Sequence, residues 1–302
     1  MELKIQHLSK KYPRGKQALS DVSVTIGSGL FGLLGPNGAG KSTLMRILAT
    51  LQEADSGSAF LDDIDVLKEK DRVRELLGYL PQEFGLYPKE TAYGLLDHLA
   101  YLKGHVKPHR RRAMLESLLR RTNLWDARDQ RLGTFSGGMK QRFGIAQALI
   151  GNPQLLIVDE PTAGLDPEER VRFLNILSEI GEHVIVILST HIVADVSYLC
   201  HSMAILHEGR VVAAGEPAEL AGALRGRIWQ VSPARSEMQR YHDTCQVVSS
   251  RFAAGRPFIR VYAEQPPGSE FELVEPEVDD VYFRAMSEPA IVTTASSGDS
   301  PC

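Results

Sequence analysis

The sequence has few features of a secreted or membrane-spanning protein. Its 302 residues include three cysteines, Cys200, Cys245 and Cys302, and no Cys-x-x-Cys pair. Such a sparse, odd set argues against a disulfide framework and fits a reducing compartment. No apolar run approaches the about 18 residues of a membrane span, and the N-terminus lacks the apolar core of a secretory signal. We therefore expect a globular chain that works in the cytoplasm.

An excess of positive charge is also missing. The 34 Lys and Arg residues stand against 38 Asp and Glu residues, which gives a formal net charge of −4. Dedicated nucleic-acid-binding proteins usually carry a basic domain, so we expect no nucleic-acid partner. At about 150 residues per domain, the length indicates about two domains. A hydrophobic content of 43% is ordinary for globular proteins and requires no metal or disulfide for a core.

Short apolar runs alternate with helical patterns over the first 220 residues. The runs cover residues 22–26, 31–34, 77–80, 155–158, 184–188 and 203–206. Strands that alternate with helices predict an α/β domain with a mainly parallel sheet. The run at 155–158 is continuously apolar, as expected for a strand that is covered on both faces.

Between residues 91 and 150 the strand pattern disappears. Leucines and a methionine recur there at helical spacing, over 95–102 and 114–119, which predicts an inserted helical subdomain. Residues 103–131 contain nine Lys or Arg residues and three Asp or Glu residues. This local positive charge fits a solvated helical face, and it also fits proximity to anionic lipid headgroups.

After about residue 222 the composition changes. Strand-like runs cover 227–231 and 258–262, and the stretch 264–280 holds seven acids and no base. A short helix with Pro276 near its first turn is expected next. We therefore predict a main domain over residues 1–222, an accessory extension over 223–286 and a disordered, polar tail over 287–302.

The strongest motif is a glycine-rich loop between the strand 31–34 and a helical run at 44–48. It matches GxxxxGK[ST], in which glycines let successive backbone N–H groups face phosphates at a helix N-terminus. Lys41 is predicted to reach the β- and γ-phosphates, and the Ser42 hydroxyl to bind Mg²⁺. The predicted nucleotide-binding residues of this loop are Gly35, Pro36, Asn37, Gly38, Ala39, Gly40, Lys41, Ser42 and Thr43.

Two further elements belong to the same chemistry. The apolar strand 155–158 ends in Asp159 and Glu160, at the edge where open α/β sheets bind ligands. Asp159 is predicted to hold Mg²⁺, and Glu160 to accept a proton from an attacking water as general base. The run Ser136, Gly137 and Gly138 precedes a helical segment, so it is predicted to be a second phosphate-binding helix N-terminus.

Together with the downstream His191, these motifs resemble the nucleotide-binding subunit of an ABC transporter. The resemblance covers about residues 2–220 and rests on Lys41, Ser136–Gly138, Asp159–Glu160 and His191 in that order. It implies an α/β fold of the P-loop NTPase type. That fold is an ABC cassette with a RecA-like core, a helical subdomain at about residues 85–150 and a small α+β C-terminal extension.

The resemblance also implies roles for single residues. Tyr12 lies at the position of an aromatic residue that stacks on adenine. Gln82 resembles the glutamine that links the metal site to the helical subdomain, and it is implied as a catalytic and metal-site residue. Asp166 lies in the loop that crosses the dimer interface, and His191 resembles the switch histidine at the γ-phosphate. Met139 replaces the glutamine usual in the family signature, which backbone phosphate binding should tolerate.

The implied mechanism needs partners. In the family, the P-loop and the signature helix lie on opposite sides of one domain. A second copy, or a paralogous cassette, must therefore complete each site around ATP and Mg²⁺. ATP hydrolysis is then expected to drive transport through a membrane-spanning permease at the cytoplasmic face of the cell membrane. An apolar cluster of Phe84, Leu86 and Tyr87 is expected either to receive a permease helix or to pack internally.

Transport direction rests on a softer similarity. Residues 274–283 resemble a Pro/Glu-Asp-Val-Phe element of stand-alone prokaryotic exporter ATPases, so an exporter is expected. The alternatives are an importer subunit and a soluble, non-transport ABC ATPase. Soluble repair or translation factors would need coiled-coil insertions or two cassettes. A kinase or GTPase would lack the Ser136 signature and His191, and a GTPase would also carry a base-reading Asn/Thr-Lys-x-Asp motif.

Overall fold

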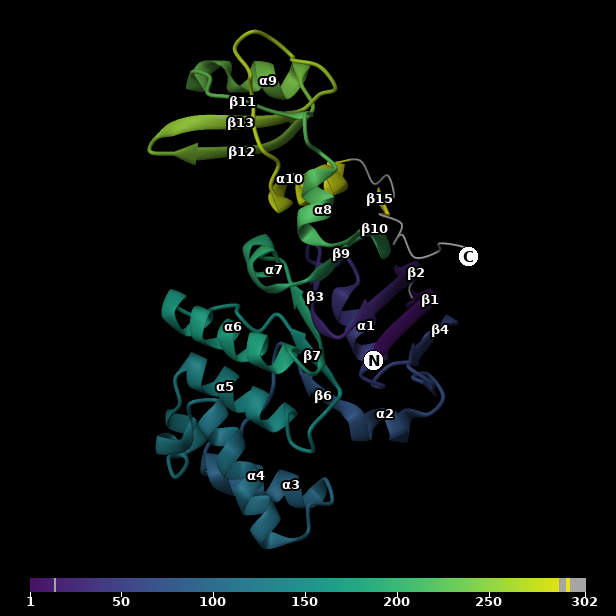
Figure 1. Ribbon diagram of the computed structural model, residues 1–302, viewed down its shortest axis with the longest axis vertical. Coiled ribbons are helices and arrows are strands. Elements are labelled where there is room, and N and C mark those ends of the chain that lie inside the picture. Colours follow the sequence, from purple (N-terminus) through teal and green to yellow (C-terminus); the bar gives the residue numbers. More distant parts are fainter. Residues whose placement is uncertain (14, 288–291, 294–302) are drawn as a thin grey trace, which may run out of the picture.

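The computed structural model describes residues 1–13, 15–287 and 292–293, which form the three sheets of Figure 1. The largest sheet has seven strands in the order β15-β10-β9-β3-β8-β7-β6. These strands are β3 (Gly29–Leu34), β6 (Leu77–Leu80), β7 (Leu155–Asp159), β8 (Ile185–Thr190), β9 (Ser202–His207), β10 (Arg210–Gly215) and β15 (Val292–Thr293). The pairs among β9, β3, β8, β7 and β6 are parallel, whereas β10 pairs antiparallel with β9. The predicted α/β class is confirmed.

The parallel core determines where the candidate site lies. Because parallel strands share a carboxyl edge, the segments that follow β3, β6, β7 and β8 emerge together. The glycine-rich loop follows β3 and leads into α1 (Lys41–Leu48), while Gln82 follows β6. Asp159 ends β7, and His191 directly follows β8. Residues separated by up to 150 positions in the chain are thus brought to one edge.

A second sheet, β2-β1-β4-β5, lies beside the first and is antiparallel. Its strands are β1 (Glu2–Lys11), β2 (Gln17–Gly27), β4 (Ser56–Leu61) and β5 (Ile64–Asp65), and α2 (Lys70–Leu76) follows them. Leu3 and Ile5 of β1 share one apolar cluster with Met45 of α1 and Ile157 of β7. This cluster holds the helix after the glycine-rich loop between the two sheets.

The segment between β6 and β7 is helical, as predicted. It contains α3 (Ala92–Leu102), α4 (Pro108–Arg121) and α5 (Gly137–Ala148), which form the lower end of the molecule in Figure 1. Leu96, Leu115 and Phe143 from these helices share a cluster with Val158 of the central sheet. On the same side of the main sheet lie α6 (Pro167–Gly181) and α7 (Val193–Leu199).

The C-terminal region contains a separate small sheet, β12-β13-β11-β14, at the opposite end of the molecule (Figure 1). Its elements are β11 (Ile228–Val231), α9 (Met238–Thr244), β12 (Val247–Ala253), β13 (Arg256–Tyr262) and β14 (Glu272–Leu273). They enclose a small apolar cluster of their own around Tyr241 and Phe271. This sheet follows α8 (Pro217–Gly222).

The last described helix, α10 (Val278–Ser287), returns to the main domain. It contacts α7, α8 and β9 as well as β12. Val278, Val281 and Ala285 belong to the apolar cluster of the main domain, so residues 223–286 do not pack as one unit. Of the predicted disordered tail, Ser287 ends α10 and Val292–Thr293 pair with β10, while the rest lies outside the described residues. The predicted boundary at residue 222 stays a prediction.

The other strand predictions agree with the structure to within a few residues, except that seven strands among the described residues were not predicted. These are β1, β4, β5, β10, β12, β14 and β15. They are short, or they mix polar residues with buried ones, as in β1 and β12, where only one face is covered. Within the described ranges, no helix is long and apolar enough to cross a membrane.

Candidate functional site

The glycine-rich loop wraps around the side chain of Lys41. Gly40 has φ +111°, a left-handed conformation that glycine adopts readily, and it caps α1 directly before Lys41. A Cβ at Gly40 would also overlap the carbonyl oxygen of Ala18. The Lys41 Nζ donates to the carbonyl oxygens of Gly35 at 2.7 Å and Pro36 at 3.2 Å. The ammonium group is therefore buried inside the loop at the N-terminus of a helix, where phosphate binds best.

Glu160 connects Lys41 to His191. One carboxylate oxygen of Glu160, Oε1, lies 3.4 Å from Lys41 Nζ, and the other, Oε2, lies 3.0 Å from His191 Nδ1. Glu160 also has φ +47°, a left-handed conformation that is uncommon for residues other than glycine. Its backbone N–H donates to the Ser189 carbonyl of the neighbouring strand. The carboxylate is therefore held at the carboxyl edge between a cation and an imidazole.

Asp159, one residue earlier, has a different environment. Its side chain is only 3% exposed, and its Oδ1 has no hydrogen-bond partner among the described residues. A buried carboxylate oxygen without a partner is costly unless a cation or its water shell satisfies it. Hard oxygen donors of this kind suit Mg²⁺. The residues present therefore fit the predicted metal, with Ser42 and Gln82 lining the adjacent cavity.

Tyr12 is bound to the loop through its hydroxyl group. That group lies 3.2 Å from Thr43 Oγ1 and within 3.1 Å of the Gln52 side-chain amide. The pKa of the Tyr12 phenol is lowered, chiefly by the hydrogen bond with Thr43. Burial opposes this shift, and the hydrogen bond with Gln52 adds to it. The ring is thereby fixed at the rim of the loop. Its stacking on adenine stays a prediction.

Most of these groups surround one cavity of about 350 Å³, whereas the predicted site residues Gly35, Ala39, Asp159 and His191 do not line it. It brings together the glycine-rich loop, Tyr12, Gln82 and Glu160, and His191 joins it through its bond to Glu160. Two lining residues, Lys16 and Ala18, were missed in the sequence. Both lie at or beside the start of β2, and no local sequence pattern marks them, because β2 reaches the glycine-rich loop through the contact of Ala18 with Gly40.

The second glycine-rich element lies outside this cavity. Ser136 caps α5, and its Oγ accepts a hydrogen bond from the backbone N–H of Met139 at 3.2 Å. Asp166 caps α6 in the same way, accepting from Glu169 N at 2.9 Å. Among the described residues, none of Ser136, Gly137, Gly138 and Asp166 lines the nucleotide cavity. The side chain of Met139 packs against the apolar cluster, which explains why an apolar residue is accommodated there.

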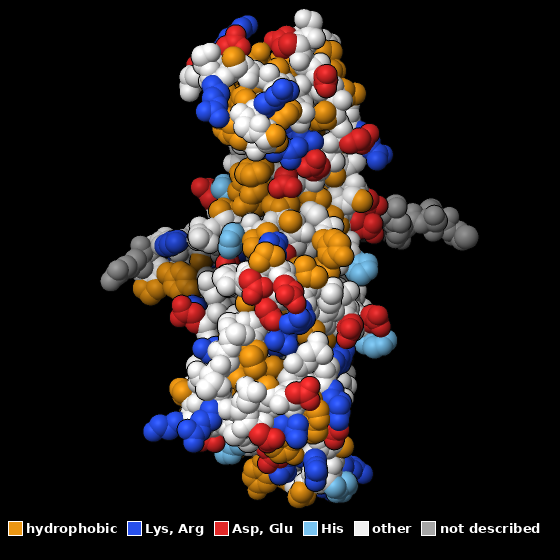
Figure 2. Space-filling model, turned by 90° about the vertical axis from the view of Figure 1, so that its left-hand side faces the viewer, with side chains coloured by type: hydrophobic (Ala, Val, Ile, Leu, Met, Phe, Trp, Pro, Cys, Tyr) orange, Lys and Arg blue, Asp and Glu red, His pale blue; other side chains and the backbone are white. Residues whose placement is uncertain are grey.

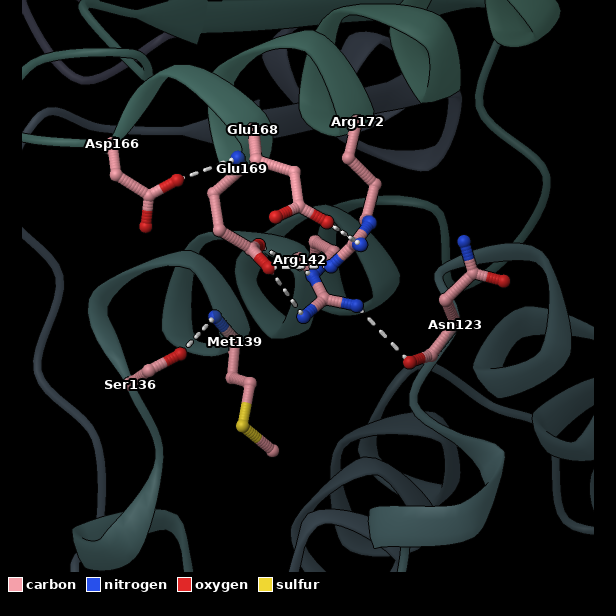
Figure 3. Close-up of polar contacts among 8 residues, drawn as sticks. All are labelled: Asn123, Ser136, Met139, Arg142, Asp166, Glu168, Glu169 and Arg172. Atoms are coloured by element: carbon pink, nitrogen blue, oxygen red, sulfur yellow. Dashed lines mark hydrogen bonds and ion pairs between the residues drawn. The ribbon is translucent and has the colours of Figure 1, made fainter.

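A buried ion pair joins the two capped helices. Arg142 of α5 lies between α5 and α6 in Figure 3, with its Nε 3.2 Å from Glu169 Oε2. Arg142 also donates to the Asn123 carbonyl at 3.1 Å, and Arg172 binds Glu169 from the other side at 2.6 Å. Burial lowers the pKa of Arg142, which the nearby Glu169 carboxylate counteracts. The Arg142–Glu169 pair thus joins α5 to α6, the two helices that Ser136 and Asp166 cap.

Comparisons with known proteins agree with this geometry. A family model described as ABC transporter matches residues 19–163. The probable multidrug ABC transporter ATP-binding protein YbhF of Escherichia coli K12 is 38% identical over 223 residues, 73% of this chain; the chain spans only 38% of that relative. The phosphonates import ATP-binding protein PhnC 2 of a Synechococcus species is 35% identical over 75% of this chain and 90% of its own length.

The solved structures include the ATP-binding cassette MJ0796, described as a dimer in a post-hydrolysis state bound to ADP and Pi. It has a TM-score of 0.64 and 25% identity to this chain, and the match covers 71% of this chain and 98% of that one. The predicted P-loop NTPase cassette is thereby confirmed. The family model covers the glycine-rich loop, the Ser136 element and the end of β7, and PhnC 2 is 35% identical over an alignment that covers 90% of its length. This chain therefore belongs to the ATP-binding proteins of ABC transporters, which are ATPases.

Proposed function

We propose that the chain is the ATP-hydrolysing motor of a membrane exporter and works as a nucleotide-sandwich dimer bound peripherally to a permease. The observation that carries the proposal is the division of the site: one cavity holds the P-loop and Glu160, while Ser136–Gly138 and Asp166 lie elsewhere. A second cassette must supply its own Ser136 to complete the site, in a symmetric arrangement. The dimeric cassette MJ0796 supports this arrangement by similarity.

In this mechanism each residue has one task. Lys41 and the N–H groups of the P-loop bind and orient the phosphates of ATP. Ser42, Gln82 and Asp159 would hold Mg²⁺, which supplies charge neutralisation at the phosphates. Glu160 accepts the proton of the attacking water, and His191, 3.0 Å away, orients that carboxylate. Hydrolysis then removes the γ-phosphate that holds the two cassettes together.

The division of the site is tested by mixing two inactive variants. Each site of the proposed dimer combines the P-loop of one copy with the Ser136 signature of the other. Lys41→Ala inactivates the P-loop half of a site, and Ser136→Arg inactivates the signature half. When the two are mixed, half of the dimers are mixed ones with one intact site, so ATPase activity should return to about a quarter of the wild-type value. Each variant alone serves as the control. A mixture as inactive as the single variants would contradict completion in trans.

The direction of transport is proposed from the C-terminal element. Residues 274–283, which include the first part of α10, carry the similarity to exporter subunits, and YbhF is named as a multidrug protein. PhnC 2, named as an import protein, keeps the importer as the alternative. Purification with its membrane partner from native membranes separates either transporter from a soluble ABC ATPase. A chain that is recovered without any membrane protein would favour the soluble class.

The seam between the main domain and the helical subdomain offers the permease contact. Of the predicted cluster, Phe84 and Leu86 are partly buried against the apolar core, and a Cβ built at Gly144 would lie 2.8 Å from Phe84 Cζ. Phe84 therefore packs internally, and only Tyr87, 66% exposed, is free to contact a partner. A hollow of about 380 Å³ lies on the same seam and is lined by Arg74, Leu77, Tyr79, Leu99, Leu102, Lys103, Gln147, Ala148 and Ile150. It would fit part of a coupling helix.

Tyr87→Ala is therefore expected to uncouple the motor. Basal ATPase activity of the purified chain should stay within about twofold of wild type, because the exposed ring supports no core packing. Transport per ATP hydrolysed, measured with the permease in proteoliposomes, should fall. Phe84→Ala is the contrasting variant, since it removes a packed ring and should lower stability and ATPase together. Unchanged transport per ATP in Tyr87→Ala would assign the contact to another surface.

A further inference from the structure

The turn between α3 and α4 concentrates positive charge. Residues 98–115 contain no acid but five Lys or Arg residues and three histidines, in a chain whose net charge is −4. Lys103 is engaged with the Ile150 carbonyl at 3.0 Å, and Arg111 with Asp97 at 2.6 Å. The other three cations are exposed and have no carboxylate partner among the described residues; they are Lys107, Arg110 and Arg112.

Apolar side chains stand beside these charges. Eleven large hydrophobic side chains are exposed over the described part of the chain, and three of them fall within residues 101–106. They are Tyr101 (54% exposed), Leu102 (66%) and Val106 (58%). We call this surface, formed by Tyr101, Leu102, Val106, Lys107, Arg110 and Arg112, the α3–α4 patch. Figure 2 shows hydrophobic, basic and histidine side chains together at the lower end of the molecule, which α3 and α4 form.

The patch is presented by an ordered turn. Gly104 has φ +90° and donates its N–H to the Tyr101 carbonyl at 3.0 Å, which ends α3. Arg111 Nη1 donates to the carbonyls of His105 at 2.9 Å and Val106 at 3.3 Å, while its Nε binds Asp97. These hydrogen bonds order the turn and present its side chains at the surface.

We propose that the α3–α4 patch contacts the surface of a bilayer that contains anionic lipids. Exposed apolar side chains that lie among Lys and Arg residues match the interface of such a bilayer, where apolar groups enter the headgroup boundary and cations meet lipid phosphates. Leu102 also lines the hollow proposed for the permease helix, so the patch continues from that site. This last argument rests on the proposed function, whereas the charge complementarity does not.

The test uses the full-length chain and extruded vesicles, without ATP or permease. We expect sedimentation with vesicles of phosphatidylcholine and phosphatidylglycerol, little with phosphatidylcholine alone, and weakening as salt rises. Lys107→Gln/Arg110→Gln should lower the association constant roughly 25-fold, about fivefold per removed charge. Val106→Ser should lower it by a smaller factor. The matched control is Arg235→Gln/Arg240→Gln, which removes the same charge from exposed residues of the C-terminal region.

Several results would overturn the proposal. They are no sedimentation of the wild-type chain with anionic vesicles, equal binding to both lipid compositions, and equal losses in the patch and control variants. A different outcome would show that the patch contacts protein: the wild-type chain does not sediment with vesicles, and the patch variant no longer co-purifies with the permease. Failure of the motor function would appear separately, because the ATPase mixing experiment uses residues of other elements.

Discussion

Glu160→Gln is expected to lower the rate of ATP hydrolysis about 10²- to 10⁴-fold, the usual range for loss of a general base. The reason is that glutamine keeps the shape of the side chain but cannot accept the proton of the attacking water. Lys41 loses the Glu160 carboxylate 3.4 Å from its Nζ but keeps its hydrogen bonds to the Gly35 and Pro36 carbonyls, so ATP should still bind. Single-turnover hydrolysis and equilibrium binding of labelled ATP measure the two effects separately.

The same variant should change the oligomeric state. If bound γ-phosphate joins two cassettes and hydrolysis releases them, a chain that binds but does not hydrolyse ATP should accumulate as a dimer. Size-exclusion chromatography with light scattering, with ATP and with ADP, measures this. Glu168→Gln is the matched control, because Glu168 is an exposed glutamate of α6 that pairs with Arg172. Wild-type ATPase activity in Glu160→Gln would refute the general-base role.

The nucleotide half of the site was predictable from sequence for a topological reason. Parallel strands deliver their following loops to one edge, so the apolar runs at 31–34 and 155–158 predicted that Lys41 and Glu160 lie together. Gln82 and His191 were implied only by the resemblance to ABC cassettes, and they follow β6 and β8 at the same edge. Lys16 and Ala18 could not be placed in the same way. They line the cavity because the start of β2 passes the glycine-rich loop, where a Cβ at Gly40 would overlap the Ala18 carbonyl oxygen. That contact joins separate segments of the chain and leaves no local pattern in the sequence.

Two features of the structure depend on tertiary packing that the sequence did not reveal: which aromatic ring of the 84–87 cluster is buried, and where α10 packs. Phe84 and Tyr87 are neighbours in an apolar stretch, yet one ring packs on α5 and the other is exposed. The acidic stretch before residue 281 looked like part of an accessory unit, but α10 packs on the main domain. Neither outcome follows from hydropathy, because both depend on which surface lies opposite each side chain.

A buried charge pair joins the small C-terminal sheet to α10. Arg260 of β13, 6% exposed, donates to Asp280 of α10 at 2.6 Å and to Glu277 at 2.9 Å. Asp280 is fully buried and also accepts from the backbone N–H of Glu277. Burial raises the pKa of Asp280, while the hydrogen bond from Glu277 and the charge of Arg260 oppose that shift.

Arg260→Ala is therefore expected to destabilise the protein by about 3–5 kcal/mol, because it leaves a buried carboxylate without its counter-charge. Chemical denaturation followed by the fluorescence of Trp229, which lies in the neighbouring strand β11, measures the loss. Arg251→Ala is the control: Arg251 is exposed and 3.8 Å from Glu277, so its loss should cost about 1 kcal/mol or less.

Two further measurements distinguish the loss of charge pairing from a loss of packing. In Arg260→Ala the folded pKa of Asp280 lies further above its unfolded value, so the stability contributed by the protonated carboxyl is lost as pH rises. The variant should therefore be closest to wild type at acidic pH and least stable at neutral pH. Arg260→Met/Asp280→Leu, which replaces both charges by apolar groups, should recover most of the stability. A deficit that is independent of pH and persists in this double variant would show that the sheet is held by shape rather than by charge.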